Sequence, residues 1–308
     1  MTGPTGGTSQ WQEIVDWCRR ELGSSPRGHF FNAGHISQVV GVELEDGRQV
    51  VVKLRPPDER VRAAIAVQRL LFERGFPCPE PLSGVSRLGR MLASAEAFVP
   101  AGPLVGQPPA DECAEGLARL VDLAGDPSMF PELAPPLPWV AWDGPREGNW
   151  PPADDLDLDL NNPPGPPWLE AAAERVRCRL SAGAWPAVIG HCDWEAHNLG
   201  WTDGHIAVAY DWDSLGSRSD PAIAGAAAAV FASAPGGPVA ADVGQTGAFL
   251  DAYRRGRPSW DEDASELAYA AGLWVLLYNA RKELAGGGTG YLEHLSRELQ
   301  ARLERAGA

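Results

Sequence analysis

Lysine is nearly absent from this chain. Only two of its 26 basic residues are lysines, Lys53 and Lys282, and the others are arginines. Basic residues are also outnumbered, because 41 acidic residues give a formal net charge of −15. This excess of negative charge disfavours nucleic acid or an anionic membrane as the main partner, and we expect neither. Since arginine is the general cation here, each lysine is a candidate for a specific role.

Cysteine is also scarce, and long apolar runs are missing. The five cysteines are widely spaced and form no CxxC pair. This pattern argues against a disulfide scaffold and indicates reduced thiols. No apolar run approaches the roughly 20 residues of a membrane-spanning helix, and residues 1–9 lack the basic start and apolar run of a signal peptide. We therefore expect a soluble, cytoplasmic protein.

Hydrophobic periodicity predicts an α+β chain. Strands are expected at 38–44, 48–54 and 91–99, and Asp46-Gly47 favours a hairpin between the first two. Helices are expected at 9–22, 58–74, 111–124, 168–180, 220–233, 244–254, 261–284 and 291–306. The segment 125–167 is rich in Pro, Trp and Asp and has no clear period. This insert is expected either to form a wall or lid of a binding site or to pack on the surface through its tryptophans.

The residues with the most specific chemistry lie between positions 191 and 213. Asn198 follows Asp193 by five positions, and Asp211 comes shortly after a hydrophobic run. Phosphoryl transfer uses such a set, because one carboxylate receives the acceptor's proton while an amide oxygen and a second carboxylate hold magnesium. Lys53 lies at the end of a strand rich in β-branched residues. In kinase-type sites a lysine at such a position contacts nucleotide phosphates through its flexible ammonium group. The sequence thus predicts Asp193 as the catalytic base, Asn198 and Asp211 as Mg²⁺ ligands, and Lys53 as a phosphate-binding residue.

These motifs resemble those of the aminoglycoside phosphotransferase and choline kinase-like superfamily, the small-molecule relatives of protein kinases. The family's His-Gly-Asp loop corresponds to His191-Cys192-Asp193, its Ile-Asp-Trp-acid element to residues 210–213, and its later Asp-Pro to Asp220-Pro221. The resemblance implies a bilobal protein-kinase-like fold. It places a small antiparallel sheet in an N-lobe, residues 1–100, and a mainly helical C-lobe in residues 101–308. It also implies that His191 braces the loop structurally.

The resemblance further implies which residues contact nucleotide and acceptor. The loop that includes Asn32 and Gly34 would cover the phosphates, and Glu96 and Phe98 would meet the adenine edge through main-chain groups. A plain turn and an edge strand are the alternatives at these two places. Four polar residues are candidate contacts for the acceptor: Glu195, His197, Asp213 and, in the insert, Asp157.

Two positions depart from the family's pattern. The acid that usually pairs with the lysine from the following helix is replaced by Ala64, with Glu59 and Gln68 as possible substitutes on neighbouring turns. The acid that often follows Asp-Pro is replaced by Ala224. The first departure would change the affinity for nucleotide or the position of Lys53.

The resemblance implies transfer of the γ-phosphate of ATP or GTP to a hydroxyl of a small, cationic molecule such as an aminoglycoside or other antibiotic. A metabolic kinase for an amino alcohol, sugar or amino acid is an alternative, and so is a degenerate homologue that binds nucleotide without turnover. We expect a monomer or homodimer. A zinc site at His191, Cys192, His197 and His205 is disfavoured because these residues lie too close along a loop and lack paired spacing. A Cys192–His197 nucleophilic pair is disfavoured because no oxyanion element is visible.

Overall fold

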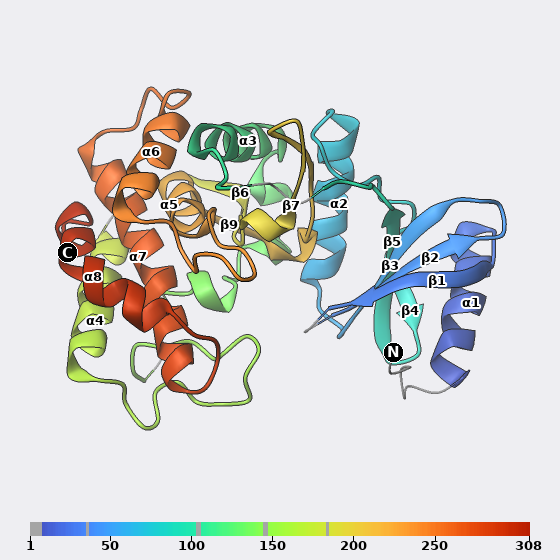
Figure 1. Cartoon of the computed structure of the whole chain (residues 1–308), viewed down its shortest axis with the longest axis horizontal. Coiled ribbons are helices and arrows are strands. Elements are labelled where there is room, and N and C mark those ends of the chain that lie inside the picture. Colours follow the sequence, from blue (N-terminus) through green and yellow to red (C-terminus); the bar gives the residue numbers. More distant parts are fainter. Residues whose placement is uncertain (1–7, 35–36, 103–105, 144–146, 183–184) are drawn as a thin grey trace. The chain divides into compact units, whose positions relative to one another are not determined.

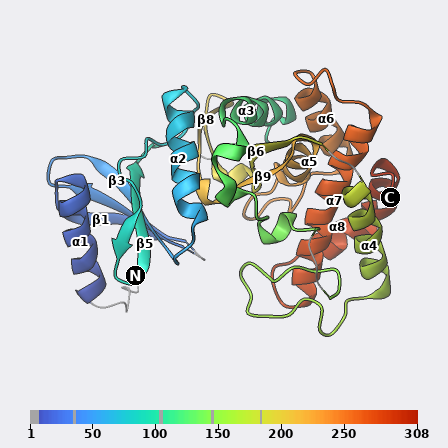
Figure 2. The ribbon, with the colours of Figure 1, turned by 180° about the vertical axis from the view of Figure 1, so that it is seen from behind.

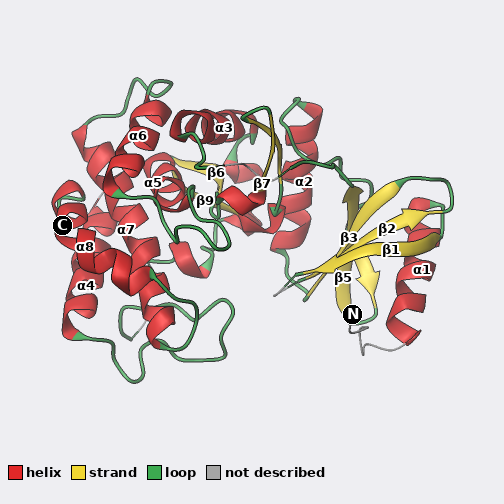
Figure 3. Cartoon of the chain, viewed as in Figure 1, coloured by secondary structure: helices red, strands yellow, loops and turns green. Residues whose placement is uncertain are grey.

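The computed structural model of this chain describes residues 8–34, 37–102, 106–143, 147–182 and 185–308. The chain divides into two compact units, Met1–Pro100 and Ala101–Ala308, called unit 1 and unit 2 below. Strands concentrate in unit 1 and helices in unit 2 (Figure 3). The predicted α+β architecture is therefore confirmed. None of the helices in the described part combines the length and apolar character that a membrane span requires.

Unit 1 is built on a five-stranded antiparallel sheet with the order β1-β2-β3-β5-β4 (Figure 1). Its elements are α1 (Thr8–Leu22), β1 (Pro26–Ala33), β2 (Gln38–Leu44), β3 (Gln49–Arg55), α2 (Arg60–Glu73), β4 (Ser86–Leu88) and β5 (Met91–Ala97). On one face, α1 buries Ile14 and Trp17 against Val42 and Val52. Because side chains alternate along a strand, Lys53 lies on the opposite face.

Helix α2 packs on the face of the sheet that carries Lys53. Val61 and Ile65 of α2 form a small buried cluster with Leu92 of β5. Leu92 belongs to the same face as Lys53, since it pairs with Arg55 two residues further along β3. The two faces of this sheet therefore differ: α1 covers an apolar face, and α2 covers a face that contains buried charge.

Unit 2 consists mainly of helices packed around α7. Its helices are α3 (Ala110–Leu123), α4 (Pro167–Ala182), α5 (Asp220–Val230), α6 (Val243–Arg254), α7 (Glu262–Leu284) and α8 (Tyr291–Arg305). Helices α4 and α8 both contact α7 (Figure 2). Helices α5 and α7 approach closely at Gly225 and Gly272. A Cβ atom at Gly225 would lie 1.8 Å from the carbonyl oxygen of Ala268, so only glycine permits this crossing.

Two short antiparallel strand pairs carry the polar loops of unit 2. Strand β6 (Ala187–His191) pairs with β9 (Leu215–Ser219), and β7 (Leu199–Thr202) pairs with β8 (His205–Ala209). These four strands, together with β1 and β4, were not predicted. The strands of unit 2 are too short for a reliable period, and β1 is interrupted by two register shifts.

The insert of residues 125–167 packs on unit 2 through its aromatic residues. Its described part, residues 125–143 and 147–167, contains three single turns of 3₁₀-helix: Pro127–Met129, Pro131–Leu133 and Pro138–Val140. Trp150 stacks on Trp274 of α7 at a centroid distance of 5.6 Å. The guanidinium of Arg218 lies 4.3 Å from the ring centre of Trp142. This packing confirms the second of the two expectations for the insert, whereas a role in acceptor binding stays a prediction.

Candidate active site

The loop between β6 and β7 is braced by a buried histidine. His191 is fully buried, and its Nε2 lies 3.0 Å from the carbonyl oxygen of Tyr210. Its Nδ1 accepts a 3.2 Å hydrogen bond from the backbone N–H of Asp193. The imidazole therefore ties the loop that contains Asp193 to the segment that precedes Asp211. This is the bracing role that the resemblance implied.

Asn198 holds Asp193 through its side-chain amide. The Nδ2 group of Asn198 donates to the carboxylate Oδ2 and to the carbonyl oxygen of Asp193, both at 2.9 Å. Asn198 ends a single 3₁₀ turn, Ala196–Asn198, and is buried. Since the amide nitrogen is engaged by Asp193, the amide oxygen Oδ1 is the atom that this residue can offer to a metal ion.

Asp211 sits next to Asn198 in an unusual backbone conformation. The N–H of Tyr210 donates a 2.8 Å hydrogen bond to the carbonyl oxygen of Asn198, so the two segments are joined directly. Asp211 has φ 55° and ψ 55°, a left-handed conformation that costs a non-glycine residue about 1 kcal/mol or more. Ser214 holds this side chain by donating from Oγ to Oδ2 at 2.7 Å. The strain is offset by contacts that orient one carboxylate.

Burial and neighbouring carboxylates raise the pKa of Asp193. Burial and the negative charges of Glu195 and Asp211 raise the pKa of Asp193 to about 8, although His197 and the hydrogen bond from Asn198 oppose the shift. Carboxylates gathered in this way favour either a proton or a bound cation. The arrangement therefore suits a site that takes up positive charge, as a metal ion or as part of a substrate.

Glu195 and His197 form a pair beside Asp193. The Nδ1 of His197 lies 3.1 Å from Oε2 of Glu195, and Ser233 donates to the same oxygen at 3.1 Å. The hydrogen bond to Glu195 raises the pKa of His197 above its usual value, and the charges of Glu195, Asp193 and Asp211 add to this effect. The two candidate acceptor contacts thus lie together, and His197 is half exposed with a side-chain exposure of 43%.

The other two candidate acceptor contacts lie in different settings. Asp213 is half-buried in the 3₁₀ turn Trp212–Ser214, two positions after Asp211. Asp157 is exposed in the insert. Within the described residues, no hydrogen bond or ion pair joins Asp157 to the loop of Asp193. Its predicted contact with an acceptor stays a prediction.

Three neighbours of this loop were not predicted: Tyr291, Glu283 and Asp154. Tyr291 begins α8, and its pKa is raised by burial and by the negative charges of Glu195, Asp193, Glu283 and Asp154. Helix α8, the end of α7 and the insert therefore meet near the loop. These residues are distant in the sequence and belong to no common motif, so only the tertiary fold shows their proximity.

The insert also reaches the loop through one tryptophan. Trp139 donates from Nε1 to the carbonyl oxygen of Cys192 at 2.8 Å. Cys192, which replaces the family's glycine, is 2% exposed. The insert therefore supports the backbone immediately before Asp193.

Two residues of the zinc alternative, His191 and His205, have other partners in this structure. Both ring nitrogens of His191 are engaged, one by the carbonyl oxygen of Tyr210 and the other by the backbone N–H of Asp193. His205 lies on β8, where its Nδ1 contacts Oε2 of Glu112 at 3.2 Å. Among the residues that the structure describes, no three His, Cys, Asp or Glu side chains are arranged to hold a metal ion.

In unit 1, Lys53 forms a buried ion pair with Glu96. The Nζ of Lys53 lies 2.9 Å from Oε1 of Glu96, and both side chains are 8% exposed. This corrects two expectations. The partner of Lys53 is neither Glu59, which is exposed, nor Gln68, which instead donates to Glu96 Oε2 at 3.0 Å. The side chain of Glu96 serves Lys53, whereas only a main-chain contact with adenine was predicted for this residue.

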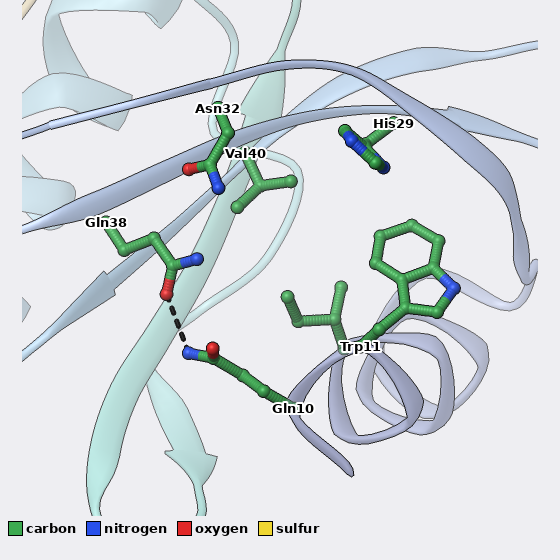
Figure 4. A pocket seen from close by; sticks show the side chains of 7 residues that line it. Gln10, Trp11, His29, Asn32, Gln38 and Val40 are labelled. Atoms are coloured by element: carbon green, nitrogen blue, oxygen red, sulfur yellow. Dashed lines mark hydrogen bonds between the residues drawn. The ribbon is translucent and has the colours of Figure 1, made fainter. Parts of the chain in front are cut away.

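Asn32 lies on the other face of the sheet from Lys53. It pairs with Val40 in the sheet, and its side chain lines a pocket beneath α1 together with Trp11, His29 and Gln38 (Figure 4). A phosphate contact at Asn32 would therefore have to come from its backbone. Gly34 has φ 108°, and a Cβ there would lie 1.9 Å from the carbonyl oxygen of Ser37, so glycine is required.

Phe98 joins an aromatic cluster at the end of β5. Its ring lies 5.0 Å from that of Phe30 and 6.1 Å from that of Phe31. The backbone N–H of Phe98 donates to the carbonyl oxygen of Gln49 at 3.0 Å. This N–H group is thus engaged in the sheet, and a main-chain contact between this segment and adenine stays a prediction.

Comparisons with known proteins show the family and the fold of this chain. The model of the phosphotransferase enzyme family matches residues 27–262. The comparison with curated proteins found no match. Among solved structures, the amicoumacin kinase hAmiN in complex with AMP-PNP, Ca²⁺ and Ami is similar with 13% identity and a TM-score of 0.64, covering 96% of this chain and 93% of that chain.

Two further solved structures show the same fold. Spectinomycin phosphotransferase APH(9)-Ia, in complex with ADP and spectinomycin, has 13% identity and a TM-score of 0.56, covering 96% of this chain and 93% of that chain. A type I macrolide 2'-phosphotransferase has 17% identity and a TM-score of 0.59, covering 100% of both chains. The predicted protein-kinase-like fold is confirmed by these likenesses. Because the family model spans most of its length, the chain belongs to the phosphotransferase enzyme family.

Proposed function

We propose that this enzyme transfers the γ-phosphate of ATP or GTP to a hydroxyl group of a small cationic molecule, such as an aminoglycoside or another antibiotic. The observation that carries the proposal is the connected group of Asp193, Asn198 and Asp211. One amide holds the first carboxylate, and a backbone hydrogen bond joins the segments of the other two. This set supplies one base and two oxygen ligands, as phosphoryl transfer requires.

Asp193 is the proposed general base. The acceptor's hydroxyl oxygen forms a bond to the γ-phosphorus, the bond from that phosphorus to the β–γ bridging oxygen breaks, and the hydroxyl proton passes to the carboxylate of Asp193. Asn198 fixes the orientation of this carboxylate through Oδ2. In unit 1, Lys53 is proposed to bind phosphate oxygens through its ammonium group.

The donor atoms of Asn198 and Asp211 fit a magnesium ion. Mg²⁺ prefers hard oxygen ligands and is usually held by one or two protein groups together with substrate phosphates and water. Asn198 offers its amide oxygen, and Asp211 offers Oδ1 because Oδ2 accepts from Ser214. When bound there, the ion would neutralise negative charge on the phosphates.

The acidic surroundings of Asp193 support a cationic acceptor. Glu195 lies beside the proposed base, and Glu283 lies near Tyr291 at the edge of the same region. Ammonium groups on an acceptor would be attracted by these carboxylates. The solved structures with the same fold include a spectinomycin phosphotransferase and a macrolide 2'-phosphotransferase, which supports an antibiotic as acceptor. Phosphorylation of a metabolic amino alcohol, sugar or amino acid would use the same chemistry. A screen of antibiotics and metabolites as acceptors therefore decides between these classes.

The first experiment measures thermal stabilisation by ATP and by GTP, each with and without magnesium. A ligand that binds only the folded state raises its melting temperature. We expect a magnesium-dependent increase in wild type that is lost in Asp211→Asn. The control is Asp251→Asn, which removes an exposed carboxylate from α6. A positive result leads to a screen of antibiotics and metabolites for phosphoryl transfer.

Two results would contradict the proposal. If neither nucleotide stabilises wild type, the enzyme does not use ATP or GTP. If nucleotide binds but Asp193→Ala transfers phosphate to the identified acceptor at the rate of wild type, Asp193 is not the base.

A further inference from the structure

We propose that Glu96 is the residue that positions Lys53 for nucleotide phosphates, and that it does so from the sheet instead of from helix α2. The inference rests on the proposed function, because it assumes that Lys53 binds phosphate. It assigns a role to a residue of β5 that no motif predicted. It is based on the contacts that join Lys53, Glu96 and Gln68 in unit 1.

The ion pair is a cross-strand contact inside the sheet. Glu96 pairs with Val51, and Lys53 pairs with Ser94, so Lys53 and Glu96 are diagonal neighbours on one face of β3 and β5. Long side chains at such positions reach each other. The ammonium lies 2.9 Å from Oε1 of Glu96. In the described part of unit 1, Glu96 is the acidic residue within ion-pair distance of Lys53.

Helix α2 contributes the side-chain amide of Gln68 to this arrangement, and not a carboxylate. Gln68 is 2% exposed, and its Nε2 donates to Glu96 Oε2 at 3.0 Å and to the carbonyl oxygen of Pro79 at 2.9 Å. Ala64 lies one turn earlier on the same side of α2 and is 2% exposed. The helix therefore orients the carboxylate of Glu96 but provides no charge of its own to Lys53.

This geometry leaves the ammonium group suited to a phosphate. Lysine has three N–H donors, and Glu96 accepts one of them. A carboxylate on the neighbouring strand holds the side chain in one direction, so less rotamer freedom is lost when phosphate oxygens bind. Since both charges belong to adjacent strands of one sheet, the position of Lys53 does not depend on a charge carried by α2.

The test compares Glu96→Gln with wild type for binding of Mg·ATP and of adenosine, which lacks phosphates. We expect Mg·ATP affinity to fall by roughly 10- to 100-fold, the value of one or two charge-assisted hydrogen bonds. Adenosine affinity should stay within about twofold, because an effect through Lys53 concerns the phosphates only. Equal losses for both ligands would mean that Glu96 supports the fold of unit 1 instead, and an unchanged Mg·ATP affinity would also overturn the inference. Glu43→Gln, on the exposed end of β2, is the matched control.

A double-mutant cycle keeps the inference testable if the single variant folds poorly. Lys53→Met together with Glu96→Gln removes both charges, so no buried charge is left unpaired. If Glu96 acts through Lys53, adding Glu96→Gln to Lys53→Met causes no further loss of Mg·ATP affinity. A further loss of tenfold or more would contradict the inference. Absence of ATP and GTP binding in wild type would refute the proposed function, whereas wild-type binding with an inert Glu96→Gln change would refute only this inference.

Discussion

The side-chain amide of Asn198 donates two hydrogen bonds to Asp193, one to its carboxylate and one to its backbone carbonyl oxygen, both at 2.9 Å. The two bonds fix the side chain and the backbone of Asp193 at once. They also decide which atom of Asn198 remains for a metal ion. The proposed base and one of the proposed metal ligands are thus held together by direct hydrogen bonds.

The first prediction concerns the base. Asp193→Ala should lower kcat by roughly 10²- to 10⁴-fold, the usual contribution of general base catalysis. The Michaelis constant for the nucleotide should change much less, because Asp193 is not expected to bind phosphates. The measurement is a steady-state assay with the acceptor found by the screen. A reduced affinity for nucleotide with an unchanged kcat would contradict this assignment.

The second prediction concerns the loss of folding stability when Asp193 becomes ionised. Its pKa in the folded state is raised from 3.8 to about 8, so the folded state holds a proton that the unfolded state releases between these values. Stability therefore falls as pH rises from about 4 to about 8. Asp193→Asn, measured without metal or nucleotide, should raise the melting temperature at pH 8.5 and have little effect near pH 4. Each kcal/mol regained corresponds to about 2–4 °C in a unit of this size.

A matched variant distinguishes this effect from a general loss of negative charge. Asp157→Asn removes an exposed carboxylate from the same unit and should leave the melting temperature nearly unchanged at both pH values. If Asp193→Asn stabilises the protein equally at pH 4 and pH 8.5, the raised pKa is not the cause.

Periodicity and local motifs were sufficient for the helices and for the centre of the site. Helices α3 to α8 begin close to the expected residues because each has a repeated apolar side and a polar or glycine-rich boundary. Asp193 and Asn198 lie within one loop, so their spacing is a property of the sequence alone. The role of His191 as a brace was implied by the family resemblance.

The partner of Lys53 could not be predicted from the sequence. Glu96 is 43 positions away by sequence number and reaches Lys53 only because β5 pairs with β3. The same limit applies to Tyr291, which lies near Asp193 because α8 packs against α7. Pairing of distant strands and packing of helices set these contacts, and neither leaves a local pattern.

The third prediction uses the small number of lysines. Selective isotope labelling of lysine side chains should give two sets of NMR signals, from Lys53 and Lys282. Addition of Mg·ATP should shift the signal of Lys53 and leave that of Lys282 nearly unchanged, because only Lys53 is proposed to bind phosphate. Lys53→Met assigns the signals by removing one of them. A shift confined to Lys282 would place the phosphates elsewhere.

The fourth prediction concerns the attachment of the insert to α7. The ammonium of Lys282 lies 2.6 Å from Asp154 and 2.7 Å from Asp155, and its side chain is 8% exposed. Removal of this charge would leave two carboxylates without their cation in a partly buried place. Loss of one partner of such a cluster typically costs about 3–5 kcal/mol. Lys282→Met should therefore lower the free energy of unfolding by about this amount in urea titrations.

Two further variants show whether the cost comes from the unpaired carboxylates. Adding Asp154→Asn and Asp155→Asn to Lys282→Met should regain much of the lost stability, because no net charge is then left in the cluster. Arg297→Met is the control, since its partner Glu293 is exposed on α8 and a surface pair contributes less than about 1 kcal/mol. If Lys282→Met costs no more than Arg297→Met, the cluster does not anchor the insert. If the triple variant is as unstable as Lys282→Met, lost packing of the lysine stem, and not its charge, explains the effect.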